Sequence, residues 1–236
     1  MKALLTLCIA LTVVVVDPDK SYLLGKFDPA SDVRFSKLGG EHTSGAAIGG
    51  YLRKETYDAF VAMADAAKNE GIQLTIISAT RNFESQKQIW ENKWNGKVRV
   101  EGKDLTTVKN PEERARMILR YSSMPGSSRH HWGTDMDFNS LENSYFEAGE
   151  GLKIYQWLTT HAPEYGFCQP YTSKAGGRTG YEEEKWHWSY LPLSQPLLDE
   201  YIKNIHYEDI AGFKGGETAV TVRIIDDYVQ GISCSH

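Results

Sequence analysis

Two short segments of the chain carry the side chains that a hydrolytic metal site needs. They are residues 128–137, with the sequence SRHHWGTDMD, and residues 184–188, with the sequence EKWHW. Two imidazoles and one carboxylate hold a zinc ion and leave a fourth position for water. The ion lowers the pKa of that water, and a glutamate three residues before the last histidine is placed to take its proton. Together the segments predict a zinc centre with a catalytic base.

In the first segment the candidate ligands are His130 and Asp137. They are seven residues apart, so no regular element brings them together by its period, but a turn at Gly133 followed by a strand would. In such a strand Asp135 shares a face with Asp137, and Met136 points the other way. An aspartate buried in an apolar strand needs a partner, and a cation supplies one. Taken alone, a His–Asp combination of this kind is more often an ordinary hydrogen-bonded pair or a turn feature than a metal site.

The second segment adds the third ligand and the base. On a strand, His187 faces one side while Trp186 and Trp188 face the other. Glu184 lies at the entrance of that strand, close enough to reach a water on a metal bound by His187. The alternative is a sheet edge with stacked aromatic side chains and a surface glutamate. Both segments together favour the metal centre.

The remaining sequence predicts one α+β domain, in which a small antiparallel sheet carries the zinc site and helices flank it. Apolar spacing and capping residues predict helices at 54–69, 82–95, 151–161 and 191–205, and another from Asn110; β-branched runs predict strands at 73–79 and 134–138. Residues 22–50 and 165–180 are rich in turn residues and are predicted to be mainly loop. The apolar residues of 220–229 suit either a strand or a helix.

Composition excludes some functions. A length of 236 residues with 41% hydrophobic residues suffices for a substantial core. The formal net charge is -5 and no long basic run occurs, which argues against a nucleic-acid partner. We expect a monomer.

The two motifs together resemble those of a known family. The residues Ser128-x-His130-x-x-Gly133-x-Asp135-x-Asp137 and Glu184-x-Trp186-His187 resemble the motifs of the zinc D-alanyl-D-alanine carboxypeptidases. These are related to the vancomycin-resistance D,D-peptidases, the lysostaphin-type endopeptidases and the hedgehog signalling domain. The resemblance covers about 52–190. It implies that His130, Asp137 and His187 hold the zinc and that Glu184 is the general base.

The resemblance also implies roles for three further residues. Arg81, at the end of a predicted strand, would stabilise the substrate carbonyl and the developing oxyanion, as a fixed guanidinium can. Gln86, on the helix that follows, would contact the substrate. Ser128 would donate a hydrogen bond to the terminal carboxylate of the substrate. Without the two motifs, a surface ion pair would be the preferred interpretation of Arg81.

Two residues near the ligands need separate comment. Asp135 stands where the family usually has alanine; it would either accept a hydrogen bond from a ligand histidine or narrow the choice of substrate. His131 directly follows a ligand and cannot easily bind the same ion. We expect it to support a ligand or to line the substrate site.

The N-terminus predicts export. Residues 3–16 form an apolar run after Lys2, typical of a secretory signal peptide, although no small-x-small cleavage site follows and a buried strand is the alternative. We therefore expect a signal peptide with its junction at 1–20 and one peptidase domain at 21–236, with a C-terminal extension from about 206. Removal of Cys8 leaves Cys168 and Cys234, which could form one disulfide or remain two free thiols. The expected location is secreted, periplasmic or cell envelope.

These observations predict a Zn²⁺ metallopeptidase that hydrolyses peptidoglycan stem peptides, in the first place a D-alanyl-D-alanine carboxypeptidase. The alternatives are an L,D-carboxypeptidase, a peptidoglycan endopeptidase, and a non-catalytic zinc-binding cell-wall module. The presence of both Glu184 and Arg81 favours an enzyme over the binding module.

Overall fold

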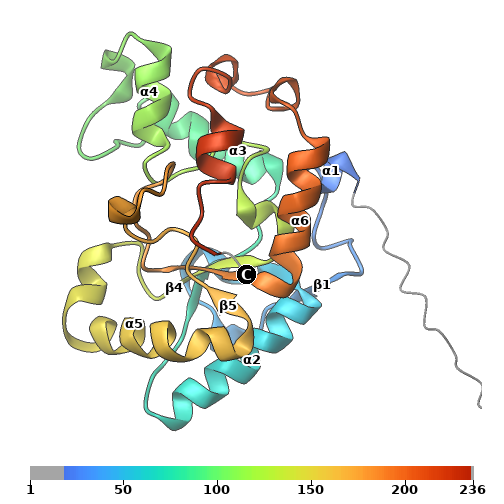
Figure 1. The fold of residues 1–236 in the computed structure, drawn as a ribbon, viewed down its shortest axis with the longest axis vertical. Helices are drawn as coiled ribbons and strands as arrows, with labels where there is room; N and C mark the ends of the chain where they lie inside the picture. Colours follow the sequence, from blue (N-terminus) through green and yellow to red (C-terminus); the bar gives the residue numbers. More distant parts are fainter. Residues whose placement is uncertain (1–18, 235–236) are drawn as a thin grey trace, which may run out of the picture.

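The computed structural model describes residues 19–234, and Figure 1 shows its ribbon. Residues 1–18 of the predicted signal peptide and junction lie outside this range, and only residues 19 and 20 lie within it. Within it, no helix has the length and apolar character needed to cross a membrane. The helices are α1 (Lys20–Leu23), α2 (Lys54–Asn69), α3 (Phe83–Trp94), α4 (Pro111–Ile118), α5 (Gly149–His161) and α6 (Leu191–Asn204). The strands are β1 (Phe35–Lys37), β2 (Tyr51–Arg53), β3 (Ile76–Ser78), β4 (Asp135–Phe138), β5 (Phe167–Cys168) and β6 (His187–Tyr190).

The central sheet is small and antiparallel, as predicted. Its four strands lie in the order β3-β4-β6-β5, and every neighbouring pair is antiparallel. β1 and β2 form a separate antiparallel pair. The metal-site strands β4 and β6 are therefore the two inner strands of the sheet, each held on both sides by backbone hydrogen bonds.

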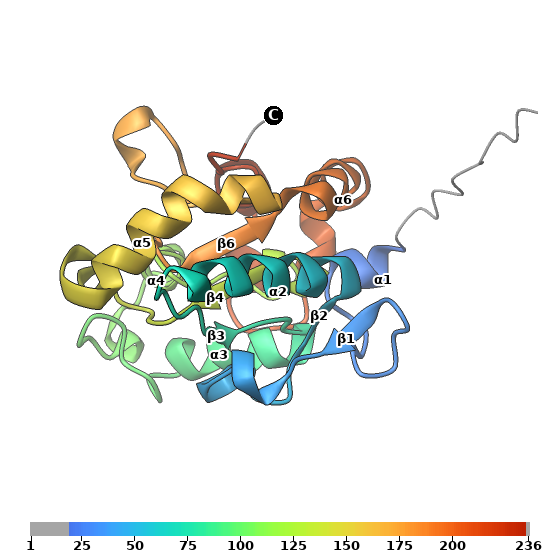
Figure 2. The ribbon, with the colours of Figure 1, turned by 90° about the horizontal axis from the view of Figure 1, so that it is seen from below.

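The sheet separates two hydrophobic cores. In Figure 1, helices α2 and α5 lie below the sheet and α3 lies above it; in Figure 2, which is seen from below, α2 lies in front of the strands. The α2/α5 core takes Met136 and Phe138 from β4 and Trp188 from β6. The second core is formed by α3, α4, α6 and the C-terminal segment, and includes Trp90 and Tyr201. Since side chains alternate along a strand, the other residues of β4 and β6 point away from the α2/α5 core.

The helices begin where local sequence signals place them. The Asn82 side chain accepts a hydrogen bond from the Ser85 backbone at the start of α3. Asn110 caps α4 in the same way, with Pro111 in the first turn, where its missing N–H costs nothing. Helix α2 spans 54–69, as predicted, and buries the face that carries Phe60 and Met63.

Two segments predicted as loop contain short regular elements. Residues 22–50 include the end of α1 and strand β1, and 165–180 include strand β5. These elements have two to four residues each, which is too few for a periodic pattern of apolar residues to be recognised in the sequence. Tertiary burial stabilises them instead: Leu23, Phe35 and Phe167 are all buried.

The C-terminal segment is part of the second core. Its apolar side chains, including Val222 and Ile225, pack there, and residues 224–229 form a single turn of π-helix. The ring of Tyr228 packs edge-on against Tyr181, with centroids 5.1 Å apart. A disulfide joins Cys168 of β5 to Cys234 and so fixes the end of this segment to the sheet. Of the two states that the sequence allows for these cysteines, the structure has the bonded pair.

Candidate metal centre and active site

The first motif folds as a turn followed by a strand, as its spacing predicts. Residues 129–132 form a 3₁₀ turn, Gly133 follows with a φ of 73°, and β4 begins at Asp135. A positive φ of this kind favours glycine. A Cβ at position 133 would also collide with the ring of Phe35. Both constraints require glycine here, and the turn reverses the chain so that His130 approaches Asp137.

Pairing of β4 with β6 brings in the third candidate ligand. Asp137 lies directly opposite His187 in the strand register. The Oδ1 atom of Asp137 is 2.9 Å from Nδ1 of His187 and 3.4 Å from Nε2 of His130. One ligand atom from each of the three residues lies within 4.8 Å of the other two, and all three residues are buried. The structure thus brings together the three residues predicted to bind zinc.

Hydrogen bonds hold both histidine rings in place. Nδ1 of His130 is 2.9 Å from the carbonyl oxygen of Ala79, which can only accept, so this nitrogen carries the proton. Nε2 of His187 is 3.1 Å from a carboxylate oxygen of Asp135, so here Nε2 donates. Nε2 of His130 and Nδ1 of His187 both face Asp137, and Nδ1 of His187 lies 2.9 Å from its carboxylate. A bound cation would displace the proton from Nδ1 of His187, and two neutral imidazoles and a carboxylate then form a donor set that fits zinc.

Asp135 belongs to a buried ionic network behind the metal-site residues. Its carboxylate accepts a hydrogen bond from Nε of Arg129 at 3.0 Å, and both side chains are almost fully buried, with exposed fractions of 0% and 1%. Burial opposes the charge, but Arg129 and His187 hold the pKa of Asp135 well below its usual value. Asp135 does not line the pocket. Its contacts agree with support of a ligand histidine and not with direct choice of substrate.

The same carboxylates make the centre favourable for a cation. Burial opposes a charged imidazole, yet the hydrogen bonds to Asp135 and Asp137 raise the pKa of His187 to about 9. Burial, together with the nearby Arg81 guanidinium, lowers the pKa of His130 and keeps this ring neutral. The centre therefore stabilises positive charge between His187 and Asp137.

Glu184 lies next to this centre and is 6% exposed. One of its carboxylate oxygens is 3.8 Å from Nδ1 of His187. Burial raises the pKa of Glu184 to about 8, which brings the carboxyl group into the range where it can exchange protons near neutral pH. The structure therefore places Glu184, the predicted base, next to His187, one of the predicted ligands.

Arg81 and Ser128 line the same pocket. Nη1 of Arg81 donates to Ser78 Oγ at 3.3 Å, and Ser78 lies opposite Asp137 in the sheet. Among residues 19–234, neither Nε of Arg81 nor Oγ of Ser128 has a hydrogen-bond partner. Both groups therefore have hydrogen-bonding capacity that no residue of the described chain uses.

Gln86 and His131 have supporting positions. Gln86 is buried, does not line the pocket, and donates its Nε2 to the Ser123 carbonyl at 2.8 Å. This position differs from the predicted contact with substrate, because α3 turns the side chain toward the backbone of the neighbouring loop. His131 is fully buried, and its Nδ1 is 2.6 Å from the Arg81 carbonyl. Burial lowers the pKa of His131 to about 3, so this neutral ring fixes the backbone of Arg81.

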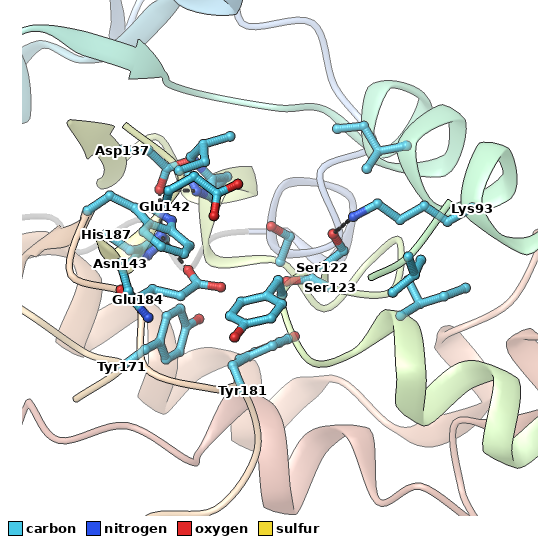
Figure 3. A pocket seen from close by; sticks show the side chains of 18 of the residues that line it. Lys93, Ser122, Ser123, Asp137, Glu142, Asn143, Tyr171, Tyr181, Glu184 and His187 are labelled. Atoms are coloured by element: carbon cyan, nitrogen blue, oxygen red, sulfur yellow. Dashed lines mark hydrogen bonds and ion pairs between the residues drawn. The ribbon is translucent and has the colours of Figure 1, made fainter. Parts of the chain in front are cut away.

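The pocket around these residues has a volume of about 690 Å³. Figure 3 shows His187, Glu184 and Asp137 on one side of it and Lys93 with Ser122 on the other, above Tyr171 and Tyr181. The two tyrosine rings pack with centroids 4.9 Å apart, and Tyr171 also packs against His187 at 4.8 Å. Sequence reasoning missed Lys93 and the tyrosines, since none belongs to either motif.

Comparison with known proteins identifies the family. Residues 49–193, well over half of the chain, match the family model of VanY, the D-alanyl-D-alanine carboxypeptidases. The chain belongs to this family. The match contains both motifs, so the metal-site residues and the VanY family region coincide.

Individual VanY-like proteins show the same relationship. The chain is 35% identical over 144 residues to YodJ of Bacillus subtilis, which is named as a carboxypeptidase; the match covers 60% of this chain but 46% of YodJ. The fold resembles a vancomycin-resistance D,D-pentapeptidase in complex with Zn(II), at 22% identity and a TM-score of 0.52 over 77% of this chain and 92% of that one. It also resembles the LdcB LD-carboxypeptidase, at 22% identity and a TM-score of 0.54 over 86% and 81%. The predicted α+β fold is thereby confirmed.

We predict that Asp135→Asn destabilises the protein, because it leaves the Arg129 guanidinium buried without its counter-charge. Breaking a buried pair in this way costs about 3 to 5 kcal/mol. Urea unfolding followed by circular dichroism, with a chelator present, measures the loss. The matched control is Asp199→Asn, which changes an exposed aspartate on α6. Equal unfolding midpoints for the two variants would contradict the role given to the Arg129–Asp135 pair.

Proposed function

We propose that this protein is a zinc metallopeptidase that removes the terminal D-alanine from peptidoglycan stem peptides. The observation that carries the proposal is the convergence of three ligand atoms within 4.8 Å, in a pocket that also contains Glu184. Membership of the D-alanyl-D-alanine carboxypeptidase family supports the reaction and the substrate class. His130, Asp137 and His187 would hold the metal.

The residues of the pocket have distinct tasks in this proposal. A zinc ion held by the three ligands would supply a Lewis acid, which would favour attack of water on the scissile carbonyl. Glu184, buried beside His187, accepts the proton of that water and delivers it to the leaving amine. Arg81, held by Ser78, donates to the oxygen on which negative charge develops.

We also propose a location in the cell envelope or outside the cell. The Cys168–Cys234 disulfide supports it, because such bonds persist in oxidising compartments. A peptidoglycan substrate requires the same location. The apolar N-terminal run is compatible with export.

The same machinery would serve an L,D-carboxypeptidase, since water activation does not depend on the configuration of the residue before the cut. The likeness to the fold of LdcB, an LD-carboxypeptidase, keeps this reaction as the second candidate. An endopeptidase would need a pocket that continues past the cut residue on both sides.

A peptide digest tests the proposal. The protein is incubated with a pentapeptide ending in L-Lys-D-Ala-D-Ala and, separately, with the tetrapeptide ending in L-Lys-D-Ala. Each reaction is run with added zinc or with a chelator, and the products are identified by mass spectrometry. We expect zinc-dependent loss of one D-alanine from the pentapeptide. Loss only from the tetrapeptide would assign the L,D-reaction instead. If stoichiometrically zinc-loaded protein left both peptides intact, the proposed carboxypeptidase activity would be wrong.

Exchange of the proposed base should separate catalysis from metal binding. Glu184→Gln removes the proton acceptor but keeps the size of the side chain, so turnover should fall roughly 100- to 10,000-fold, the usual contribution of a general base. Zinc content, measured by mass spectrometry of the metal, should stay at one ion per chain. Glu183→Gln is the control, because Glu183 does not line the pocket. Near-normal turnover in Glu184→Gln would exclude Glu184 as the base.

A further inference from the structure

Lys93 is a cation in the pocket that the proposed reaction does not use. It extends from α3, opposite His187 and Glu184 (Figure 3). Its Nζ donates a hydrogen bond to Ser122 Oγ, and the side chain lines the pocket beside Ser123. The hydroxyl group satisfies only one of the three ammonium donors. The other two remain available to a ligand.

The charge of Lys93 has no direct counter-ion in the described chain. Within residues 19–234, no carboxylate oxygen lies within 4.0 Å of its Nζ. Burial and the Arg81 guanidinium both lower the pKa of Lys93, while Glu184 on the far side raises it. A partly buried ammonium group without a counter-ion is unfavourable. An anionic ligand would remove this cost.

Two other groups in the pocket also lack partners. Ser128 Oγ is buried and unpaired within the described residues, and Nε of Arg81 is unpaired as well. Both residues line the pocket together with Lys93. Two cations and two hydroxyl groups, those of Ser122 and Ser128, thus form a set rich in donors. Such a set is suited to a carboxylate.

The substrate of the proposed reaction brings a carboxylate to this region. In a carboxypeptidase, only the residue to be released lies between the scissile carbonyl and the terminal carboxylate, a span of about 3.3 to 3.6 Å per residue. The carbonyl must lie at His130, Asp137 and His187, so the carboxylate lies just beyond them. Ser128 precedes His130 by two residues and lines the same pocket.

We propose that Lys93, together with Ser128, binds the α-carboxylate of the residue that is released and so restricts the enzyme to free C-termini. This inference rests on the proposed carboxypeptidase function and deepens it. It assigns Lys93 as a specificity-determining residue outside both motifs. An endopeptidase substrate has an uncharged peptide bond at this place and would leave the ammonium group without a counter-ion.

Paired substrates test the inference. The pentapeptide ending in D-Ala-D-Ala is compared as the free acid and as the C-terminal amide, with wild type, Lys93→Met, Lys93→Arg and Lys87→Met. Lys87 is the matched control, because it lies on the same helix but does not line the pocket. Circular dichroism and zinc content show that each variant is folded and loaded.

Wild type should prefer the free acid. Lys93→Met should raise KM for the acid roughly 10- to 100-fold, the value of one hydrogen bond to a charged group, and leave the amide unchanged. Lys93→Arg should keep most of the preference, and Lys87→Met all of it. If wild type cleaves the acid and Lys93→Met keeps the full preference, the role of Lys93 is wrong while the proposed function stands. If Lys93→Met folds poorly, Lys93→Gln replaces it, and full preference in that variant contradicts the role in the same way. If wild type cleaves neither substrate, both proposals fall.

Discussion

The alternation of side chains along strand β4 is the constraint on which the rest of the structure depends. Met136 and Phe138 are buried in the α2/α5 core, and this burial fixes which face of the strand the two aspartates occupy. A slip of one residue in the register would move all four side chains to the opposite face. The hydrophobic core therefore determines the position of the proposed metal ligand Asp137 and of its neighbour Asp135.

The buried charges on that face are arranged so that each one supports another. The guanidinium of Arg129 balances the negative charge of Asp135. Asp135 also accepts a hydrogen bond from Nε2 of His187, and this orients Nδ1 of His187 toward Asp137. Each charge alone would be costly to bury, and pairing with an opposite charge or a hydrogen-bond donor offsets part of that cost. The network explains how the fold tolerates the buried carboxylate of Asp135.

The charges in the pocket favour one orientation of the proposed substrate. The proposed base and the metal ligands lie on one side, and the ammonium group of Lys93 lies on the other. A peptide with a free terminal carboxylate complements both sides at once. The wall of Tyr171 and Tyr181 is supported from behind by Tyr228, which gives the C-terminal segment a structural part in the site.

Much of this arrangement could be predicted from the sequence. The three ligands, Glu184 and the antiparallel sheet follow from two motifs, and α2 follows from its apolar period and the glycine after it. Lys93 could not be predicted, because a lysine on an amphipathic helix is normally solvated until packing places it against Ser122. The support that Gln86 gives to Ser123, and the two-residue strand β5, likewise depend on contacts between segments far apart in the sequence.

The most direct test of the account is a crystal structure of the zinc-loaded protein, with the ion located by its anomalous scattering. We expect one zinc ion bound by Nε2 of His130, a carboxylate oxygen of Asp137 and Nδ1 of His187, with Nε2 of His187 still hydrogen-bonded to Asp135. Coordination through Nε2 of His187, or a zinc ion bound elsewhere in the pocket, would contradict the account.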